Sequence, residues 1–124
     1  MTIALWCVLA AAVMPIVFAG VAKFGGGGYN NRKPREFLEK LEGWRKRAHW
    51  AQVNSFEAFP PFAAAVIIAQ MLNAPQNQIN ALAVGFIVLR VLYGLAYLAD
   101  KQLLRSLIWT AAFGCIVGLF IVAA

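Results

Sequence analysis

Four long apolar stretches dominate this sequence of 124 residues and limit what the chain can fold into. They cover residues of about 2–22, 48–72, 76–99 and 103–124. A helix that crosses the hydrocarbon core of a bilayer needs about twenty apolar residues, at a rise of about 1.5 Å each. A soluble domain of this length could not bury a chain that is 62% apolar and only 13% charged. We therefore expect an all-α, multi-pass integral membrane protein.

The connections between the stretches predict how the helices are arranged. Residues 73–75 and 100–102 form two very short connections, so the helices that they join must be antiparallel neighbours. The chain is long enough for about one domain. We expect residues 1–124 to form a single membrane domain, an integral membrane four-helix bundle.

The basic residues indicate the orientation of the chain in the membrane. Of eleven Lys and Arg residues, eight lie in the first connection, and the second connection carries no charge. They are Lys23, Arg32, Lys33, Arg35, Lys40, Arg45, Lys46 and Arg47. By the positive-inside rule the first and third connections are cytoplasmic, and both termini face away from the cytoplasm. Because this role accounts for the net charge of +6, we expect the lipid bilayer as a partner and no nucleic acid.

The first connection, residues 23–47, contains an amphipathic segment at 34–47. Four consecutive glycines precede it, and Pro34 suits the first position of a helix. Phe37, Leu38, Leu41 and Trp44 then recur on one face. This pattern fits either a separate helix on the membrane surface or an extension of the second span beyond the bilayer.

Glu57 and Arg90 lie inside the second and third stretches, where an ionised side chain costs about 3 kcal/mol or more. Glu57 follows Arg47 by ten residues and Arg90 precedes Asp100 by ten, so both lie about 15 Å from the cytoplasmic ends of antiparallel helices. They can therefore face each other. One interpretation is a polar cleft for a small zwitterion or anion with a free amine. The other is a buried ion pair that fixes the helix register.

Cysteine and histidine give weaker signals. Cys7 and Cys115 lie at different depths in the first and fourth spans, so we expect free thiols in apolar surroundings. His49 has no second histidine or carboxylate at a ligand spacing, so we expect no metal site.

Two motifs resemble those of the MAPEG superfamily, the membrane-associated proteins in eicosanoid and glutathione metabolism. The run from Arg47 to Phe62, RAHWAQVNSFEAFPPF, is similar to the family signature Arg-Ala-x-x-Asn-x-x-Glu followed by Pro-x-Phe or Pro-Phe. In the third span, Arg90, Tyr93 and Tyr97 match the pattern Arg-x-x-Tyr-x-x-x-Tyr, and Arg105 follows near the fourth span. The resemblance covers essentially the whole chain. It implies a bacterial-type protein of the inner membrane that forms a homotrimer.

The same resemblance implies glutathione as co-substrate, held between neighbouring subunits near the cytoplasmic side. The glutathione peptide would be held by Asn54, Glu57, Arg90, Tyr93 and Tyr97, with Gln52 assisting. Arg105 matches the arginine that stabilises the glutathione thiolate, which makes it the candidate catalytic residue. The expected activity is that of a glutathione transferase or peroxidase on small apolar electrophiles.

One departure from the family pattern bears on this activity. Alignment on Asn54 and Glu57 places Trp50 where members usually carry an arginine that binds a carboxylate, and Arg47, one turn earlier, is the candidate substitute. Two alternatives follow. One is a non-catalytic structural or lipid-binding protein of the same fold. The other is a small proton-coupled multidrug exporter, which would use Glu57 as its membrane carboxylate.

Overall fold

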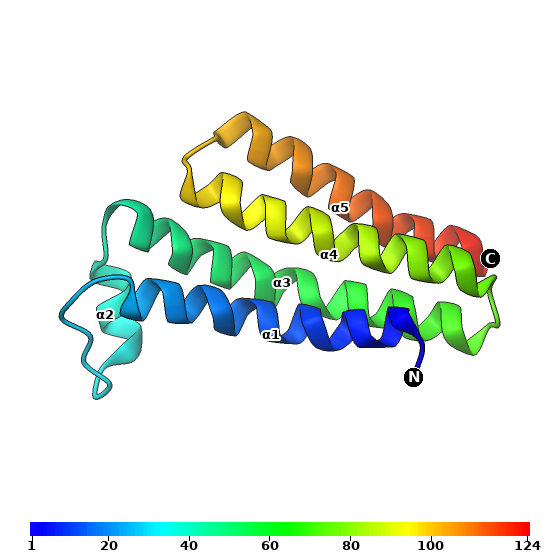
Figure 1. Cartoon of the computed structure of the whole chain (residues 1–124), viewed down its shortest axis with the longest axis horizontal. Helices are drawn as coiled ribbons and strands as arrows, with labels where there is room; N and C mark the ends of the chain where they lie inside the picture. Colours follow the sequence, from blue (N-terminus) through cyan, green and yellow to red (C-terminus); the bar gives the residue numbers. More distant parts are fainter.

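A computed structural model describes residues 1–124 and contains five helices and no strand, which confirms the all-α prediction (Figure 1). Four helices are long and one is short. In chain order they are α1 (Ile3–Phe24), α2 (Pro34–Lys40), α3 (Gly43–Met71), α4 (Gln76–Leu98) and α5 (Gln102–Ala123).

The long helices lie side by side as two antiparallel pairs (Figure 1). The pairs are α1 with α3 and α4 with α5, and they meet through α3 and α4. Further contacts join α1 to α4 and α3 to α5. Both termini lie at the end that carries the α3–α4 turn, and α2 lies at the opposite end together with the α4–α5 turn (Figure 1).

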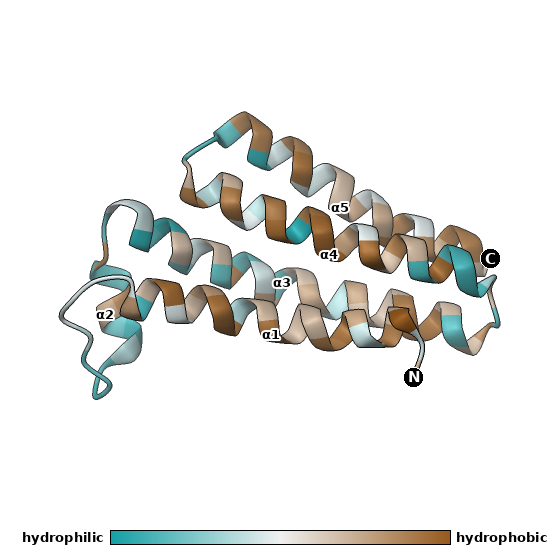
Figure 2. Cartoon of the chain, viewed as in Figure 1, coloured by the Kyte–Doolittle hydropathy of each residue, from teal (hydrophilic) through white to brown (hydrophobic).

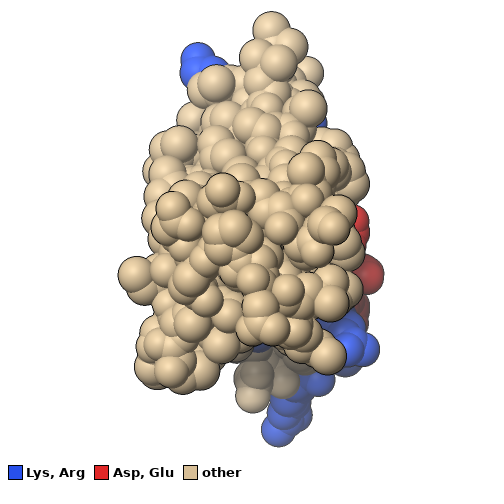
Figure 3. All heavy atoms as spheres, turned by 90° about the vertical axis from the view of Figure 1, so that its right-hand side faces the viewer, with Lys and Arg blue, Asp and Glu red and all other residues tan.

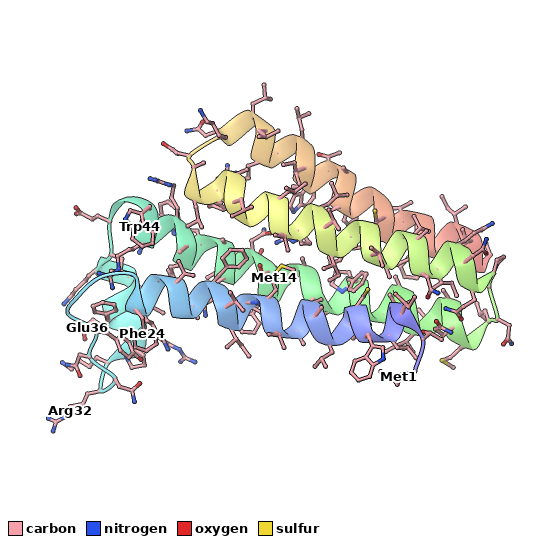
Figure 4. All side chains as sticks on the ribbon, viewed as in Figure 1. Met1, Met14, Phe24, Arg32, Glu36 and Trp44 are labelled. Carbon is pink, nitrogen blue, oxygen red and sulfur yellow. The ribbon has the colours of Figure 1, made fainter.

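Three of these helices, α1, α4 and α5, are long and apolar enough to cross a membrane (Figure 2). Helix α3 contains the second predicted span but is not among them, because Asn54, Glu57 and two prolines lower its hydropathy. Charged side chains are almost absent from the end that carries both termini (Figure 3). Arg32, Glu36 and Trp44 instead lie at the end with α2, far from Met1 (Figure 4).

The amphipathic segment divides between two helices. Pro34 begins α2, which ends at Lys40, and α3 then begins at Gly43, whose φ of 65° breaks the helical path. The two alternatives are therefore each right for one part: 34–40 is a separate helix, and 43–47 extends the long helix. On α2, the Lys40 ammonium lies 2.7 Å from the Glu36 carboxylate and holds the pKa of that carboxyl below its usual value.

Three consecutive cations at the start of α3 bind the C-terminal ends of three other helices. Arg45 donates to the carbonyl oxygens of Ala22 and Lys23 at the end of α1 and to that of Gly27 in the loop that follows. Lys46 donates to Leu38 and Glu39 in α2, and Arg47 donates to Leu98 at the end of α4. Cations stabilise helix C-termini, where carbonyl groups lack helical partners. These side chains therefore hold the helices together at the charged end.

The interior between the helix pairs combines small residues with one aromatic stack. Alanines such as Ala4, Ala11 and Ala65 are buried, which lets helix backbones approach closely. Phe62 of α3 stacks on Phe86 of α4, with ring centroids 3.9 Å apart and planes 8° apart.

At the end with both termini, amide side chains join the helices. Asn80 of α4 accepts from the backbone N–H of Ala4 at 3.1 Å, and Gln70 and Gln76 bond to each other across the α3–α4 turn. Cys7 and Cys115 are free thiols, as expected from their depths.

Candidate functional site

Arg90 is a guanidinium held in the middle of the protein, with only 2% of its surface exposed. Its Nη2 donates to Oδ1 of Asn54 on α3 at 2.7 Å. Its Cζ lies 4.1 Å from the centroid of the Tyr93 ring, one turn along α4. Both partners are neutral, so the cation is held in place by a cation–π contact and one hydrogen bond, and no carboxylate of the chain pairs with it.

Glu57 lines the same cavity as Arg90 but forms no ion pair with it. The two ion pairs of the chain both involve Glu36 at the surface. Of the two interpretations of these charges, the buried Glu57–Arg90 ion pair is therefore wrong. The Arg90 side chain instead reaches Asn54, which lies one turn closer than Glu57 to the charged end of α3.

The cavity between α3, α4 and α5 has a volume of about 210 Å³ and two unlike walls. The polar wall consists of Asn54, Glu57 and Arg90. The apolar wall is formed mainly by α5, where the Trp109 and Phe113 rings are stacked with centroids 5.5 Å apart. Sequence reasoning missed this α5 wall, because aromatic and aliphatic residues inside an apolar run carry no signal that separates a cavity from lipid.

A second group of candidates lies nearer the charged end. The Cζ of Arg105 on α5 lies 4.4 Å from the centroid of the Tyr97 ring, and Tyr97 packs edge-to-face on Tyr93 at 5.7 Å. Trp50 of α3 approaches Tyr97 with ring centroids 6.3 Å apart. The site therefore runs continuously from Arg90 to Arg105 along the inner face of α4.

A hollow of about 280 Å³ beside Arg105 is lined by the hydroxyl-bearing side chains Tyr93, Tyr97, Ser106 and Thr110. Trp109 lines both this hollow and the deeper cavity. Arg105 enters no ion pair. A group with a negative charge could therefore reach its guanidinium next to an apolar ring.

Two predicted site residues lie apart from this group. Arg47 donates to the carbonyl oxygen of Leu98 through Nε and Nη2, at 3.2 and 3.1 Å. Gln52 lies 3.3 Å from His49. It is two residues from Asn54, so it points to the opposite side of α3. Within one chain the structure thus brings together Asn54, Glu57, Arg90, Tyr93, Tyr97 and Arg105, but not Arg47 or Gln52.

Comparison with models of known protein families shows which family the chain belongs to. The model of the MAPEG family matches residues 3–124, essentially the whole sequence. The chain belongs to the MAPEG family. No curated protein and no solved structure matches it significantly. Family membership and the apolar helices together identify a membrane protein.

Residues of the two MAPEG motifs lie close together in the structure. Asn54 and Glu57 come from the motif on α3, and Arg90, Tyr93 and Tyr97 come from the motif on α4. Residues 36 positions apart in the sequence, Asn54 and Arg90, are joined by a hydrogen bond. Five residues of the two motifs therefore lie together in the site, whereas Arg47, at the start of the α3 motif, does not.

Proposed function

We propose that this MAPEG protein is a glutathione-dependent transferase or peroxidase that acts on small apolar electrophiles at the membrane. The observation that carries the proposal is that Glu57 and Arg90 line one cavity, and Arg105 a second one that shares Trp109 with it, and that no two of these three charges form an ion pair. Unpaired charges at membrane depth are costly, and they commonly mark a ligand or ion pathway.

The three charges match the chemistry of glutathione. The Glu57 carboxylate can accept hydrogen bonds from the ammonium group of the glutamyl residue, and Arg90 can donate to the carboxylate beside that ammonium. Asn54 fixes Arg90 in position for this contact. Arg105 is then left for the sulfur.

The role of Arg105 follows from thiol chemistry. A thiol with a pKa of about 8.5 is only a few per cent ionised at neutral pH, and an adjacent guanidinium favours the thiolate. In the transferase reaction, the thiolate forms a carbon–sulfur bond to the electrophile. The electron pair of the bond that breaks in the electrophile leaves with a leaving group or, in an addition, takes up a proton. In the peroxidase reaction, two glutathione molecules give a disulfide while a hydroperoxide is reduced to an alcohol and water. Trp109 offers the apolar partner a surface beside Arg105.

The assembly proposed here is a homotrimer of four-span subunits in a bacterial inner membrane. The loop 23–47 would be cytoplasmic and both termini would lie on the other side, in line with the one-sided charge distribution. Gln52 points away from its own chain's site, which suits a contact with the glutathione of a neighbouring subunit. Helix α3 would also cross the membrane, with Asn54 and Glu57 turned toward the cavity and not toward lipid.

The test is binding of glutathione to the purified protein. Titration calorimetry measures the binding, and ultraviolet absorbance detects the thiolate. We expect binding with a thiolate signal at neutral pH. In Arg105→Ala we expect the thiolate signal to disappear while peptide binding persists through Glu57 and Arg90. Absence of binding at millimolar glutathione would contradict the proposal.

Two alternatives have specific observations in their favour. Trp50, in place of a carboxylate-binding arginine, favours a non-catalytic protein of the same fold, which would show no turnover with any electrophile. The unpaired Glu57 favours a proton-coupled exporter. Arg90 in the same cavity and membership of the MAPEG family argue against it. Proton-driven efflux that survives Arg90→Ala but not Glu57→Ala would support the exporter.

A further inference from the structure

We infer that Tyr97 is a positioning residue, whose aromatic ring holds the Arg105 guanidinium at the place where the sulfur of the bound thiol reacts. This inference rests on the proposed function and deepens it, because it names what fixes the candidate catalytic cation. The family resemblance implies that Tyr97 holds the glutathione peptide, whereas the contact observed within the chain joins its ring to Arg105.

The Tyr97 ring is the contact that fixes the Arg105 side chain. The Cζ of Arg105 lies 4.4 Å from the ring centroid. Arg105 takes part in neither ion pair of the chain, and the guanidinium hydrogen bonds come from Arg45, Arg47 and Arg90. A long side chain without a partner samples several rotamers, and confining it costs conformational entropy. The ring therefore decides how often the cation is in the right place.

This kind of contact leaves the hydrogen-bond donors of Arg105 free. An aromatic ring attracts a positive charge through its electron-rich face, whereas a carbonyl or carboxylate oxygen takes up N–H groups. Arg47 shows the difference, because its Nε and Nη2 both donate to the carbonyl oxygen of Leu98. Arg105 is held in place with its donors available, as a residue that stabilises a thiolate must be.

The Tyr97 ring is itself supported from the interior of the protein. It packs edge-to-face on Tyr93, with centroids 5.7 Å apart and planes at 85°. Tyr93 is buried, and the Cζ of Arg90 lies 4.1 Å from its ring centroid. Arg90 in turn donates to Asn54 of α3 at 2.7 Å. A series of contacts therefore runs from the α3–α4 hydrogen bond to Arg105 on α5, and Tyr97 is the last support in it.

Tyr97 and Arg105 both line the hollow that a sulfur could enter. This hollow of about 280 Å³ also contains Trp109, which offers a surface to an apolar partner. The attraction between a guanidinium and a thiolate falls with their separation and with the dielectric constant around them. A guanidinium that swings from the wall of the hollow into water therefore loses most of its effect on the sulfur.

The experiment measures the pKa of the glutathione thiol bound to the detergent-solubilised protein, by the ultraviolet absorbance of the thiolate against pH. In Tyr97→Leu the ring is lost, and we expect this pKa to rise by about half a unit or more, which lowers the ratio of thiolate to thiol about threefold or more. Tyr97→Phe keeps the ring and should keep the low pKa.

The matched control is Tyr29→Leu. The Tyr29 ring also carries a cation, the Lys23 ammonium at 5.2 Å from its centroid, but it lies in the connection between α1 and α2. Its loss should leave the pKa of the bound thiol at the wild-type value.

A double variant separates positioning from direct contact with the ligand. If Tyr97 acts through Arg105, then Tyr97→Leu should change the thiol pKa little once Arg105→Ala has removed the cation. If the ring or its hydroxyl group acts on the ligand directly, the two effects add. Titration calorimetry at a pH where the thiol is neutral should show little change of glutathione affinity in Tyr97→Leu, because Glu57 and Arg90 hold the peptide.

Fluorination keeps the inference testable if Tyr97→Leu does not fold. Fluorine withdraws electron density from the ring face, so phenylalanines of increasing fluorine content in Tyr97→Phe keep the ring shape and weaken its attraction for a cation. The pKa of the bound thiol should rise with the number of fluorine atoms.

The outcomes separate the two proposals. If glutathione binds with a lowered thiol pKa that neither Tyr97→Leu nor fluorination raises, the positioning role is overturned while the proposed function stands. The same holds if Tyr97→Phe raises the pKa as far as Tyr97→Leu, or if the effects of Tyr97→Leu and Arg105→Ala add. If glutathione does not bind to the wild type, or binds with an ordinary thiol pKa, both proposals are overturned.

Discussion

Replacement of Arg45 by methionine should loosen the charged end of the protein more than any other single loss of a cation. The guanidinium makes hydrogen bonds of 3.0, 2.9 and 3.2 Å to the carbonyl oxygens of Ala22, Lys23 and Gly27. It also lies 5.4 Å from the centroid of the Phe37 ring, so it ties α2 to the same point. Methionine keeps much of the side-chain length but donates no hydrogen bond.

The size of the effect can be estimated from these contacts. A hydrogen bond to a charged group contributes about 1.5–3 kcal/mol when it is shielded from water, and an exposed one contributes much less. Two of the three bonds are partly buried and the bond to Gly27 is exposed. We therefore expect Arg45→Met to lower the free energy of unfolding by about 2–3 kcal/mol.

The assay is thermal unfolding of the detergent-solubilised protein, with Arg35→Met as the matched control. Arg35 is an exposed cation of the same connection. For a chain of this size, the expected loss corresponds to a fall in the unfolding midpoint of about 5–10 °C. If Arg45→Met and Arg35→Met unfold at the same temperature, then the cations at the start of α3 do not hold the helices together, and their role is orientation alone.

Two further predictions concern helix packing. Gly94→Ala should destabilise the protein by about 1–3 kcal/mol, because the new Cβ would overlap the buried Phe18 ring. Gly114→Ala is the control: its Cβ would meet no atom within 4 Å, and it should be neutral in the same unfolding assay. Asn80→Ala should cost about 1 kcal/mol, because the N–H of Ala4 at the start of α1 loses its acceptor, and the exposed Asn77→Ala is the comparison. Equal unfolding midpoints within either pair would contradict the packing described.

The sequence predicts the helices and the depth of the polar residues well, because both depend on simple counting. Charged residues interrupt apolar runs, and a fixed rise per residue places Glu57 and Arg90 at the same depth on antiparallel helices. The observed hydrogen bond from Arg90 to Asn54 agrees with that register to within one helical turn. The tilted contact between Trp50 and Tyr97 follows from the same arithmetic.

The partners of each charge could not be predicted in the same way. Counting gives the depth of a side chain but not which of several neighbours at that depth it reaches. The sequence therefore left a ligand cleft and a buried Glu57–Arg90 ion pair as alternatives, and the structure shows that the arginine binds Asn54. Arg47 was a candidate for ligand binding because the family pattern has an arginine where Trp50 stands, but two of its nitrogens bind Leu98. A sequence does not show which backbone carbonyl oxygens at helix ends lack partners, yet Arg45, Lys46 and Arg47 all donate to such oxygens.

The difference between a paired and an unpaired Glu57 changes what the site can do. A Glu57–Arg90 pair would satisfy both charges within the protein, and a ligand would have to break it at a cost of several kcal/mol. With Asn54 and Tyr93 as neutral partners, Arg90 stays charged and fixed while Glu57 stays available. A zwitterionic end of a peptide can then supply both missing counter-charges at once. The neutral partners of Arg90 are thus the reason why this part of the site is prepared for a ligand that carries an ammonium and a carboxylate side by side.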